Sequence, residues 1–261
     1  MSRLLILKIG GEVLDKPALR DSLLADFAAI SGPRILVHGG GKTGTEIAQR
    51  LGVETEMVNG RRITSADMLD VALMVYGGLM NKQLVSRLQA LNINALGLSG
   101  ADLDMVRASK RPAGDIDYGF VGDVGKINEA QLQQLLNQHI TPVLAPLSHD
   151  GAGQMLNTNA DTIASETARA MAGSHEVHLA FTFGKAGVLL DVDDDSSLVR
   201  HLNPAEYERL RASGQIAGGM IPKLDNAFAA LRAGVHRVYI CHAAAAGHLF
   251  TDTFIGTEIY V

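Results

Sequence analysis

The sequence has 261 residues, a length typical of one large α/β domain or of two closely fused lobes. Hydrophobic residues make up 47% and charged residues 20%, values ordinary for a globular protein with a sizeable core. The net charge of −5 and the lack of a basic block argue against a nucleic acid partner, since binding a phosphate backbone needs dense lysines and arginines. No apolar run reaches about 18 residues and no leader signal is visible, so we expect a cytoplasmic protein without a membrane partner.

Short strand-like runs alternate with longer helical stretches, which predicts an α/β fold with a mainly parallel central sheet covered on both faces. The predicted strands are 4–9, 35–38, 95–98, 140–144, 177–182, 188–190 and 235–241, and the predicted helices are 16–29, 42–51, 65–91, 159–171, 204–213 and 220–233. Asn59-Gly60 predicts a tight hairpin within 54–63, and residues 99–127 are rich in turn residues and predict further hairpins. We expect one domain over residues 1–261 with two approximate lobes, 1–150 and 151–261.

Two glycine clusters each follow a predicted strand, at Gly10-Gly11 and at 39–41. Ligands of open α/β sheets sit beyond the carboxyl ends of strands, where glycines let phosphates or carboxylates approach backbone N–H groups. A tight strand-to-helix turn explains either cluster equally well when it is taken alone. Gly41-Lys42-Thr43 does not complete a Walker phosphate loop, because position 36 is Leu where that motif needs Gly.

Two lysines occupy positions where a bound anion would explain them. Lys8 ends an otherwise apolar strand, so its charge is costly unless it extends to solvent or meets an anion. Lys223 is placed on the first turn of a helix after Gly218-Gly219, where a cation opposes the helix dipole. Between them in the chain, the polar residues 157–161 stand where another helix begins, so they are either capping residues or ligand contacts.

Arg61-Arg62 follows the predicted hairpin turn and is either a solvated charge pair or a fork for a carboxylate. The nine histidines share no ligand spacing, so the sequence predicts no metal site. Cys241 follows a strand-like run and is expected to be a buried apolar residue, because nothing nearby except His242 supports a nucleophile.

Taken together, these motifs resemble those of the acetylglutamate kinases in the amino-acid kinase family. The matching segments span nearly the whole chain in the family's order: Lys8-Ile9-Gly10-Gly11, Val37-His38-Gly39-Gly40-Gly41, Asn59-Gly60-Arg61-Arg62-Ile63-Thr64, Leu156-Asn157-Thr158-Asn159-Ala160-Asp161 and Gly218-Gly219-Met220-Ile221-Pro222-Lys223. The resemblance implies a three-layer αβα sandwich, usually dimeric. It also implies transfer of the γ-phosphoryl of ATP to the side-chain carboxylate of an N-acyl-L-glutamate, with N-acetyl-L-glutamate as the first expectation, to give an acyl phosphate in arginine biosynthesis. Mg²⁺ would be carried by the nucleotide.

The resemblance assigns roles residue by residue. Lys8 and Lys223 would neutralise the transferring phosphoryl, and Asp161 would hold both lysines in place. The first lobe would bind the acylated amino acid and the second the nucleotide. Substrate contacts would come from Gly40, Gly41, Arg62 and Asn157, and nucleotide contacts from Gly10, Gly11, Phe183, Gly184 and Lys185.

One segment departs from the family pattern. The family usually has Thr-Asp-x-x-Gly-Val near the adenine pocket, whereas residues 182–188 lack that Asp and carry one extra residue, so Lys185 is the candidate to compensate. The chain also begins directly at its first strand, which predicts an arginine-insensitive dimer. Two alternatives stay open: another amino-acid or carbamate kinase of this fold, and a non-catalytic small-molecule sensor. The acyl group, acetyl or succinyl, is not decided by the motifs.

Overall fold

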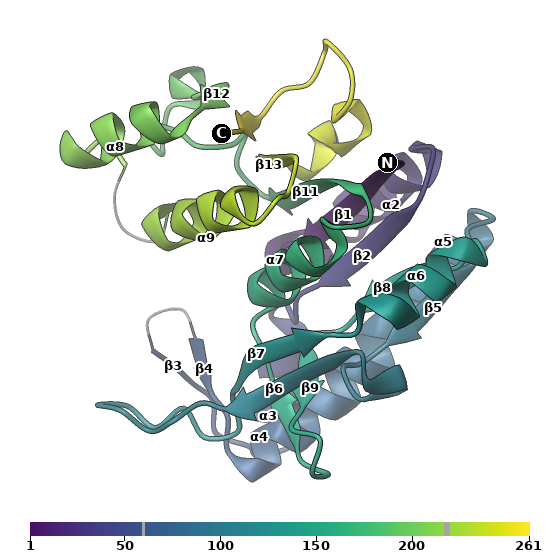
Figure 1. The fold of residues 1–261 in the computed structure, drawn as a ribbon. Helices are drawn as coiled ribbons and strands as arrows, with labels where there is room; N and C mark the ends of the chain where they lie inside the picture. Colours follow the sequence, from purple (N-terminus) through teal and green to yellow (C-terminus); the bar gives the residue numbers. More distant parts are fainter. Residues whose placement is uncertain (59–60, 217–219) are drawn as a thin grey trace.

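The computed structural model describes residues 1–58, 61–216 and 220–261. The predicted turn at Asn59-Gly60 and the glycine pair Gly218-Gly219 lie outside these described residues. Eight strands form the central sheet, in the order β12-β14-β13-β11-β1-β2-β8-β5 (Figure 1). A four-stranded sheet, β10-β9-β6-β7, and a two-stranded hairpin, β3-β4, lie beside it.

The central strands are β1 (Arg3–Ile9), β2 (Arg34–His38), β5 (Ala95–Leu98), β8 (Thr141–Leu144), β11 (Glu176–Phe183), β12 (His201–Leu202), β13 (Arg237–His242) and β14 (Thr257–Ile259). The smaller sheets comprise β3 (Glu56–Val58), β4 (Arg61–Ile63), β6 (Val106–Lys110), β7 (Gly122–Ile127), β9 (Leu147–His149) and β10 (Met155–Asn157). The α-helices are α1 (Gly11–Leu14), α2 (Pro17–Ala29), α3 (Thr43–Arg50), α4 (Ala66–Ala72), α5 (Asn81–Ala90), α6 (Glu129–Asn137), α7 (Ala160–Met171), α8 (Pro204–Ala212) and α9 (Met220–Arg232). Short helical segments are η1 (Leu73–Met80), η2 (Asp102–Asp104), η3 (Asp195–Ser197) and η4 (Ala243–His248).

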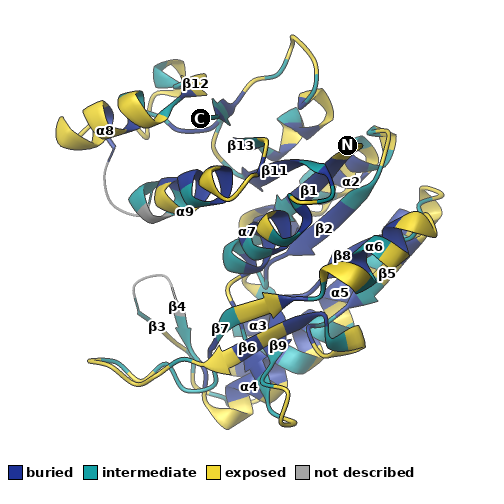
Figure 2. Cartoon of the chain, viewed as in Figure 1, coloured by how far each residue is buried: buried dark blue, intermediate teal, exposed yellow. Residues whose placement is uncertain are grey.

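Strand β1 shows how the three layers form. Its side chains alternate between two hydrophobic clusters, with Leu4 and Ile6 in one and Leu5, Leu7 and Ile9 in the other. The first cluster includes residues of α6, α7, α8 and α9, and the second includes residues of α2, α4, α5 and η1. A strand covered on both faces must be apolar along nearly its whole length, and the central strands are the most deeply buried part of the molecule (Figure 2). The predicted three-layer fold is therefore confirmed.

Pairing within the central sheet is parallel except between β13 and β14, which run antiparallel. Because β1 and β2 are parallel neighbours, their carboxyl ends and the glycine clusters that follow meet at the same edge of the sheet. The sheet is continuous across the predicted lobe boundary: β1 of the first half pairs with β11 of the second.

Several elements differ from the sequence-based expectation. A strand at Val188–Leu190 was predicted wrongly: Leu189 alone bridges to Leu198, and the Val188 N–H donates to the Thr257 hydroxyl instead of a strand ladder. The single long helix expected over 65–91 is divided by the π-helical segment η1, which contains Gly77-Gly78. Strands β9, β10 and β14 were not predicted, because three residues are too few to show a hydrophobic pattern. Helix α6 was not predicted either.

No helix among the described residues is both long enough and apolar enough to cross a bilayer.

Candidate active site

The two glycine turns pack directly against each other at the carboxyl edge of the sheet. The Gly39 N–H donates to the Ile9 carbonyl at 3.2 Å, which joins the end of β2 to the end of β1. A Cβ on Gly11 would lie 2.8 Å from the Gly41 Cα, and Gly41 itself has a φ of +56°. Side chains at these two positions would push the turns apart, so glycine is required for the close approach.

Lys8 points toward the amino end of α7. It shares a face of β1 with Leu4 and Ile6, the face that α7 covers, so strand alternation alone sets its direction. Its Nζ lies 2.7 Å from Asp161 Oδ1, and its side chain is only 13% exposed. The lysine that looked costly in the sequence is thus paired with a carboxylate inside the fold.

The same carboxylate also meets the second lysine. Lys223, on the first turns of α9, donates from Nζ to Asp161 Oδ2 at 3.1 Å. Burial by itself would raise the pKa of Asp161, but the two ammonium groups outweigh it and hold that pKa at about 2. Residues 8, 161 and 223, from three distant parts of the chain, therefore form one charged cluster with Asp161 ionised at neutral pH.

Asp161 is placed by the start of its helix. Asn159 is the N-cap of α7, and its side chain accepts from the Thr162 N–H at 3.1 Å. Asp161 follows in the first turn, where the helix dipole favours a carboxylate. In the segment 157–161, Asn159 is thus a capping residue and Asp161 is the partner of the two lysines. The sequence alone could not distinguish these two roles.

A cavity of about 470 Å³ opens beside this cluster. Its walls come from the two glycine turns, from the loop before α7, from β4, and from the end of β6 with the facing part of β7. The lining includes Lys8, Gly11, Gly40, Gly41, Arg62, Tyr76, Arg111, Asp123, Asn157 and Asp161. Lys8, Arg62 and Arg111 thus line one space beside two glycine turns, an arrangement that can receive an anionic ligand.

Arg62 and Asn157 lie on one wall of the cavity. Arg62 donates from Nη2 to the Thr45 hydroxyl at 2.7 Å, while its Nη1 is buried without a hydrogen-bond partner among the described residues. Asn157 donates from Nδ2 to the Thr64 hydroxyl at 3.0 Å. A buried guanidinium nitrogen without an acceptor is costly, which marks Arg62 as a group awaiting an anion.

Phe183, Gly184 and Lys185, which were predicted to contact the nucleotide, do not line this cavity. Lys223 lies with its Nζ 5.6 Å from the centre of the Phe183 ring, which brings Phe183 to the charged cluster. A Cβ on Gly184 would overlap the Glu12 carboxylate, so Gly184 packs against α1. Lys185 donates from Nζ to the Val192 carbonyl at 2.8 Å and is held by its own loop.

Sequence reasoning missed several cavity residues, and three of them make informative contacts. Tyr76 lies in η1, and a Cβ on Gly40 would overlap its ring. Asp15 accepts from the Lys42 N–H at 3.1 Å through both carboxylate oxygens and so ties α1 to the second glycine turn. Arg111 follows β6 and pairs with Asp123. None of the three residues belongs to a local sequence motif. The only related signal in the sequence is Gly40, where the Tyr76 ring leaves no room for a side chain.

His38 and Cys241 are structural. Burial lowers the pKa of His38 to about 4, and its ring bonds to the Gly39 carbonyl and the Asn81 amide, so it is neutral at pH 7. Burial raises the pKa of Cys241 to about 12, and the residue is fully buried, so its thiol is unreactive, as the sequence suggested.

Away from the cavity, the structure does bring one possible ligand set together. The possible ligand atoms of Glu176, His178 and His236 lie within 4.8 Å of one another, at the amino ends of the central strands. The sequence did not predict this proximity, because two neighbouring strands supply the residues.

The whole sequence is similar to known proteins of one family. Residues 3–242 match the profile of the amino acid kinase family. An acetylglutamate kinase of Phocaeicola vulgatus is 54% identical over 93% of this chain and 95% of its own length. An acetylglutamate kinase of Cytophaga hutchinsonii is 51% identical over 99% of both chains.

Among solved structures, N-acetylglutamate synthase from Neisseria gonorrhoeae, complexed with coenzyme A and N-acetyl-glutamate, superposes with a TM-score of 0.83. At 24% identity it supports the fold alone, and the match covers 99% of this chain and 59% of the length of the synthase. The profile match and the two close relatives lead to one conclusion: this chain belongs to the amino acid kinase family.

Proposed function

We propose that this protein is an ATP-dependent kinase that phosphorylates the side-chain carboxylate of an N-acyl-L-glutamate, such as N-acetyl-L-glutamate, to give an acyl phosphate in arginine biosynthesis. The observation that carries the proposal is the sharing of Asp161 by Lys8 and Lys223 beside an anion-suited cavity. Relatives more than 50% identical over nearly the whole chain are acetylglutamate kinases, which supports the same reaction.

The reaction needs charge control more than proton transfer. A glutamate side chain has a reference pKa near 4.3, so at pH 7 it is already an anion and needs no general base. The difficulty is to bring this anion in line with the γ-phosphoryl group. Lys8 and Lys223 supply two ammonium groups to the oxygens that carry the developing charge, which is the main catalytic effect available here.

Asp161 acts as a positioning residue in this scheme. Its ionised carboxylate binds both ammonium groups, so they are held close together despite their mutual repulsion. Because both of its oxygens are engaged, it is poorly placed to bind Mg²⁺, and the metal would enter on the nucleotide phosphates. When bound with the nucleotide, Mg²⁺ would supply further neutralisation of phosphate charge.

The glycine turns and Arg62 place the acceptor. We assign backbone N–H groups of Gly40 and Gly41 to the acylated substrate, Arg62 to its α-carboxylate and Asn157 to a further polar contact. Support comes from the unpartnered Nη1 of Arg62 and from the position of all four residues on the cavity wall. The first lobe would thus bind the acyl amino acid.

The base of the nucleotide is assigned to the second lobe, toward Phe183, Gly184 and Lys185, and its phosphates to Gly10 and Gly11, which the first lobe contributes at the boundary. Phe183 already contacts the Lys223 ammonium. For Lys185 to reach a nucleotide, it must first release the Val192 carbonyl.

A homodimer is the oligomeric state we propose. Strand β5 is an edge of the central sheet, and Leu96 on it is 38% exposed. Met74 and Leu79 of η1 are also exposed, and α5, which follows η1, packs on β5. An unprotected strand edge with exposed apolar side chains nearby is suited to a second copy of the chain.

The test is direct observation of the acyl phosphate. The purified protein is incubated with MgATP and N-acetyl-L-glutamate or another N-acyl-L-glutamate, and the product is trapped with hydroxylamine as a hydroxamate. We expect hydroxamate and equimolar ADP with an N-acyl-L-glutamate, and neither with free L-glutamate or carbamate. Ligand binding without phosphoryl transfer would instead identify a sensor, and transfer to carbamate alone would identify a different kinase.

A further inference from the structure

A second arginine in the cavity has the same unusual property as Arg62. Arg111 lines the cavity, its side chain is 21% exposed, and its Nη1 is buried without a hydrogen-bond partner among the described residues. Buried polar atoms in folded proteins nearly always have a partner, so two such guanidiniums in one cavity call for an explanation.

Asp123 holds Arg111 in a fixed orientation. Arg111 Nε donates to the two Asp123 oxygens at 3.0 and 3.2 Å, and Nη2 donates to the same carboxylate. This contact uses the Nε–Nη2 side of the planar guanidinium and leaves Nη1 over. The Asp123 carboxylate and burial act in opposite directions on the pKa of Arg111, and the hydrogen bond to Asp123 prevails and raises it. Arg111 is thus a permanently charged, oriented group with one nitrogen to spare.

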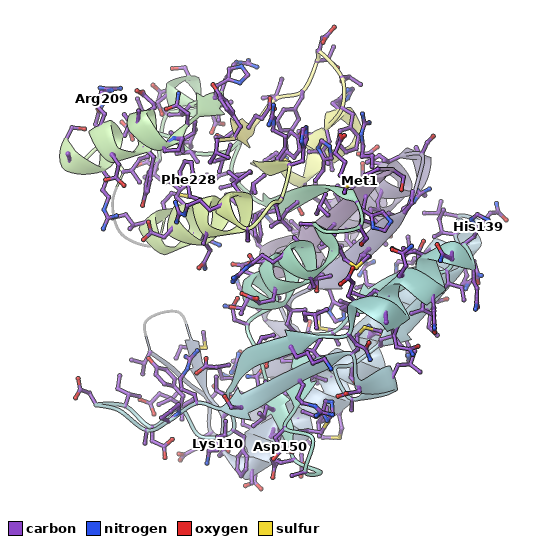
Figure 3. The ribbon with its side chains drawn as sticks, viewed as in Figure 1. Met1, Lys110, His139, Asp150, Arg209 and Phe228 are labelled. Carbon is purple, nitrogen blue, oxygen red and sulfur yellow. The ribbon has the colours of Figure 1, made fainter. Side chains whose placement is uncertain are left out.

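The two arginines come from different parts of the cavity wall. Arg111 follows β6, and its N–H donates to the Val121 carbonyl at 2.8 Å. Val121 in turn bridges to Asn157, whose side chain bonds to Thr64, two residues after Arg62. Figure 3 labels the neighbouring Lys110, at the end of β6 and well away from His139. Arg111 and Arg62 thus enter the cavity from different segments, each held by its own side-chain partner, Asp123 and Thr45.

An N-acetyl substrate leaves Arg111 without an acceptor. On the proposed function, its γ-carboxylate faces the lysine pair and its α-carboxylate faces Arg62, and the acetyl group ends in a methyl. A methyl cannot accept a hydrogen bond, so the Arg111 Nη1 would stay unsatisfied in the complex. An acyl group that ends in its own carboxylate would satisfy it with a charge-assisted bond.

We propose that the preferred substrate carries a dicarboxylic acyl group such as succinyl, and that Arg111 binds the distal carboxylate. This inference rests on the proposed kinase function and names the acyl class that its motifs leave open. Asp123 serves as a positioning residue, because it touches the guanidinium and not the ligand.

The experiment compares four substrates on the wild-type enzyme: N-acetyl-, N-succinyl- and N-succinamoyl-L-glutamate, and free L-glutamate. The succinamoyl compound has the size of the succinyl one but ends in a neutral amide. Hydroxamate formation gives kcat and KM for each substrate. We expect kcat/KM for the succinyl substrate to exceed the acetyl and succinamoyl values by about 10- to 100-fold, the range of a hydrogen bond to a charged group, and we expect no transfer to free L-glutamate.

Variants then assign the preference to one residue. Arg111→Gln is expected to lower the succinyl-to-acetyl ratio of kcat/KM to near 1, mainly through KM. Arg107→Gln is the matched control. Arg107 lies on β6, the strand that Arg111 follows, but it pairs with Asp104 and does not line the cavity. This variant should keep the wild-type ratio. Circular dichroism spectra of both variants exclude misfolding as the cause.

The outcomes separate this inference from the function beneath it. Equal or better use of N-acetyl-L-glutamate would overturn the inference and leave the kinase function intact. Equal use of the succinamoyl compound would overturn it too, because size and not charge would then set the preference. A ratio unchanged in Arg111→Gln would overturn the role of Arg111. No transfer to any N-acyl-L-glutamate would overturn the kinase function itself.

Discussion

Two charged clusters lie at opposite ends of the central strands, and each combines one carboxylate with two basic side chains. They differ in whether the polar groups around them have hydrogen-bond partners. At the carboxyl end, Lys8, Asp161 and Lys223 adjoin a cavity of about 470 Å³, and two arginine nitrogens on its wall have no partner among the described residues. Groups left unsatisfied beside an open space indicate a ligand that is meant to complete them.

At the amino end lies the cluster of Glu176, His178 and His236, in which His178 finds its hydrogen-bond partners within the protein. His178 Nδ1 lies 3.1 Å from the Tyr239 hydroxyl and its Nε2 lies 3.0 Å from Glu176 Oε1. The Tyr239 hydroxyl can donate to one ring nitrogen while the other donates to the carboxylate, so both ring nitrogens are satisfied without a ligand. Proximity of titratable groups is therefore weak evidence of function, and a buried polar atom without a hydrogen-bond partner beside a cavity is stronger evidence.

The most severe test of this contrast is loss of Lys8. On the proposed mechanism, Lys8→Met removes one of the two ammonium groups that stabilise the transferring phosphoryl, so we expect kcat to fall about 10²- to 10³-fold with a smaller change in KM. Steady-state kinetics measures the effect, and Lys126→Met, at an exposed position on β7, is the control. Near-wild-type kcat in Lys8→Met would remove the carboxyl-end cluster from catalysis.

The next effect concerns stability in acid and comes from His38, beneath the glycine turn. Its folded pKa is about 4, below the ordinary value of 6.5, so its contribution is complete above pH 6.5 and is lost as pH falls toward 4. That shift corresponds to about 3 kcal/mol. Urea unfolding at pH 7 and pH 4.5 should show a steeper loss in the wild type than in His38→Gln.

The control for the acid experiment is His201→Gln, because His201 is exposed. We expect this variant to follow the wild-type pH dependence. If His38→Gln loses stability with pH as steeply as the wild type does, another group is responsible for the acid sensitivity.

The smallest effect is expected at the amino-end cluster. Glu176→Gln keeps a hydrogen-bond acceptor for His178 and removes a half-exposed charge that solvent screens, so the free energy of unfolding should hardly change. Because the residue lies at the opposite end of β11 from the cavity, kcat/KM should stay within about twofold. A large loss of activity would show that the two clusters are coupled and that the comparison is wrong.

Local chemistry in the sequence determined much of this protein. The alternation of apolar runs predicted the three-layer fold, since a parallel sheet with two covered faces needs continuous apolar strands. Glycine pairs at strand ends and a lysine inside an apolar strand are local anomalies, so Gly10-Gly11, residues 39–41 and Lys8 could be singled out directly.

Tertiary structure alone decided which anomalies meet and which groups stay unsatisfied. That Lys8 and Lys223 share Asp161 depends on the packing of α7 and α9 on the same face of the sheet. Arg111 and Tyr76 stand in no motif, and Lys185, expected at the nucleotide, bonds instead to the Val192 carbonyl. A hydrogen bond left unmade is a property of the folded surroundings and not of neighbours in the chain, so no reading of the sequence could have found the spare nitrogen of Arg111.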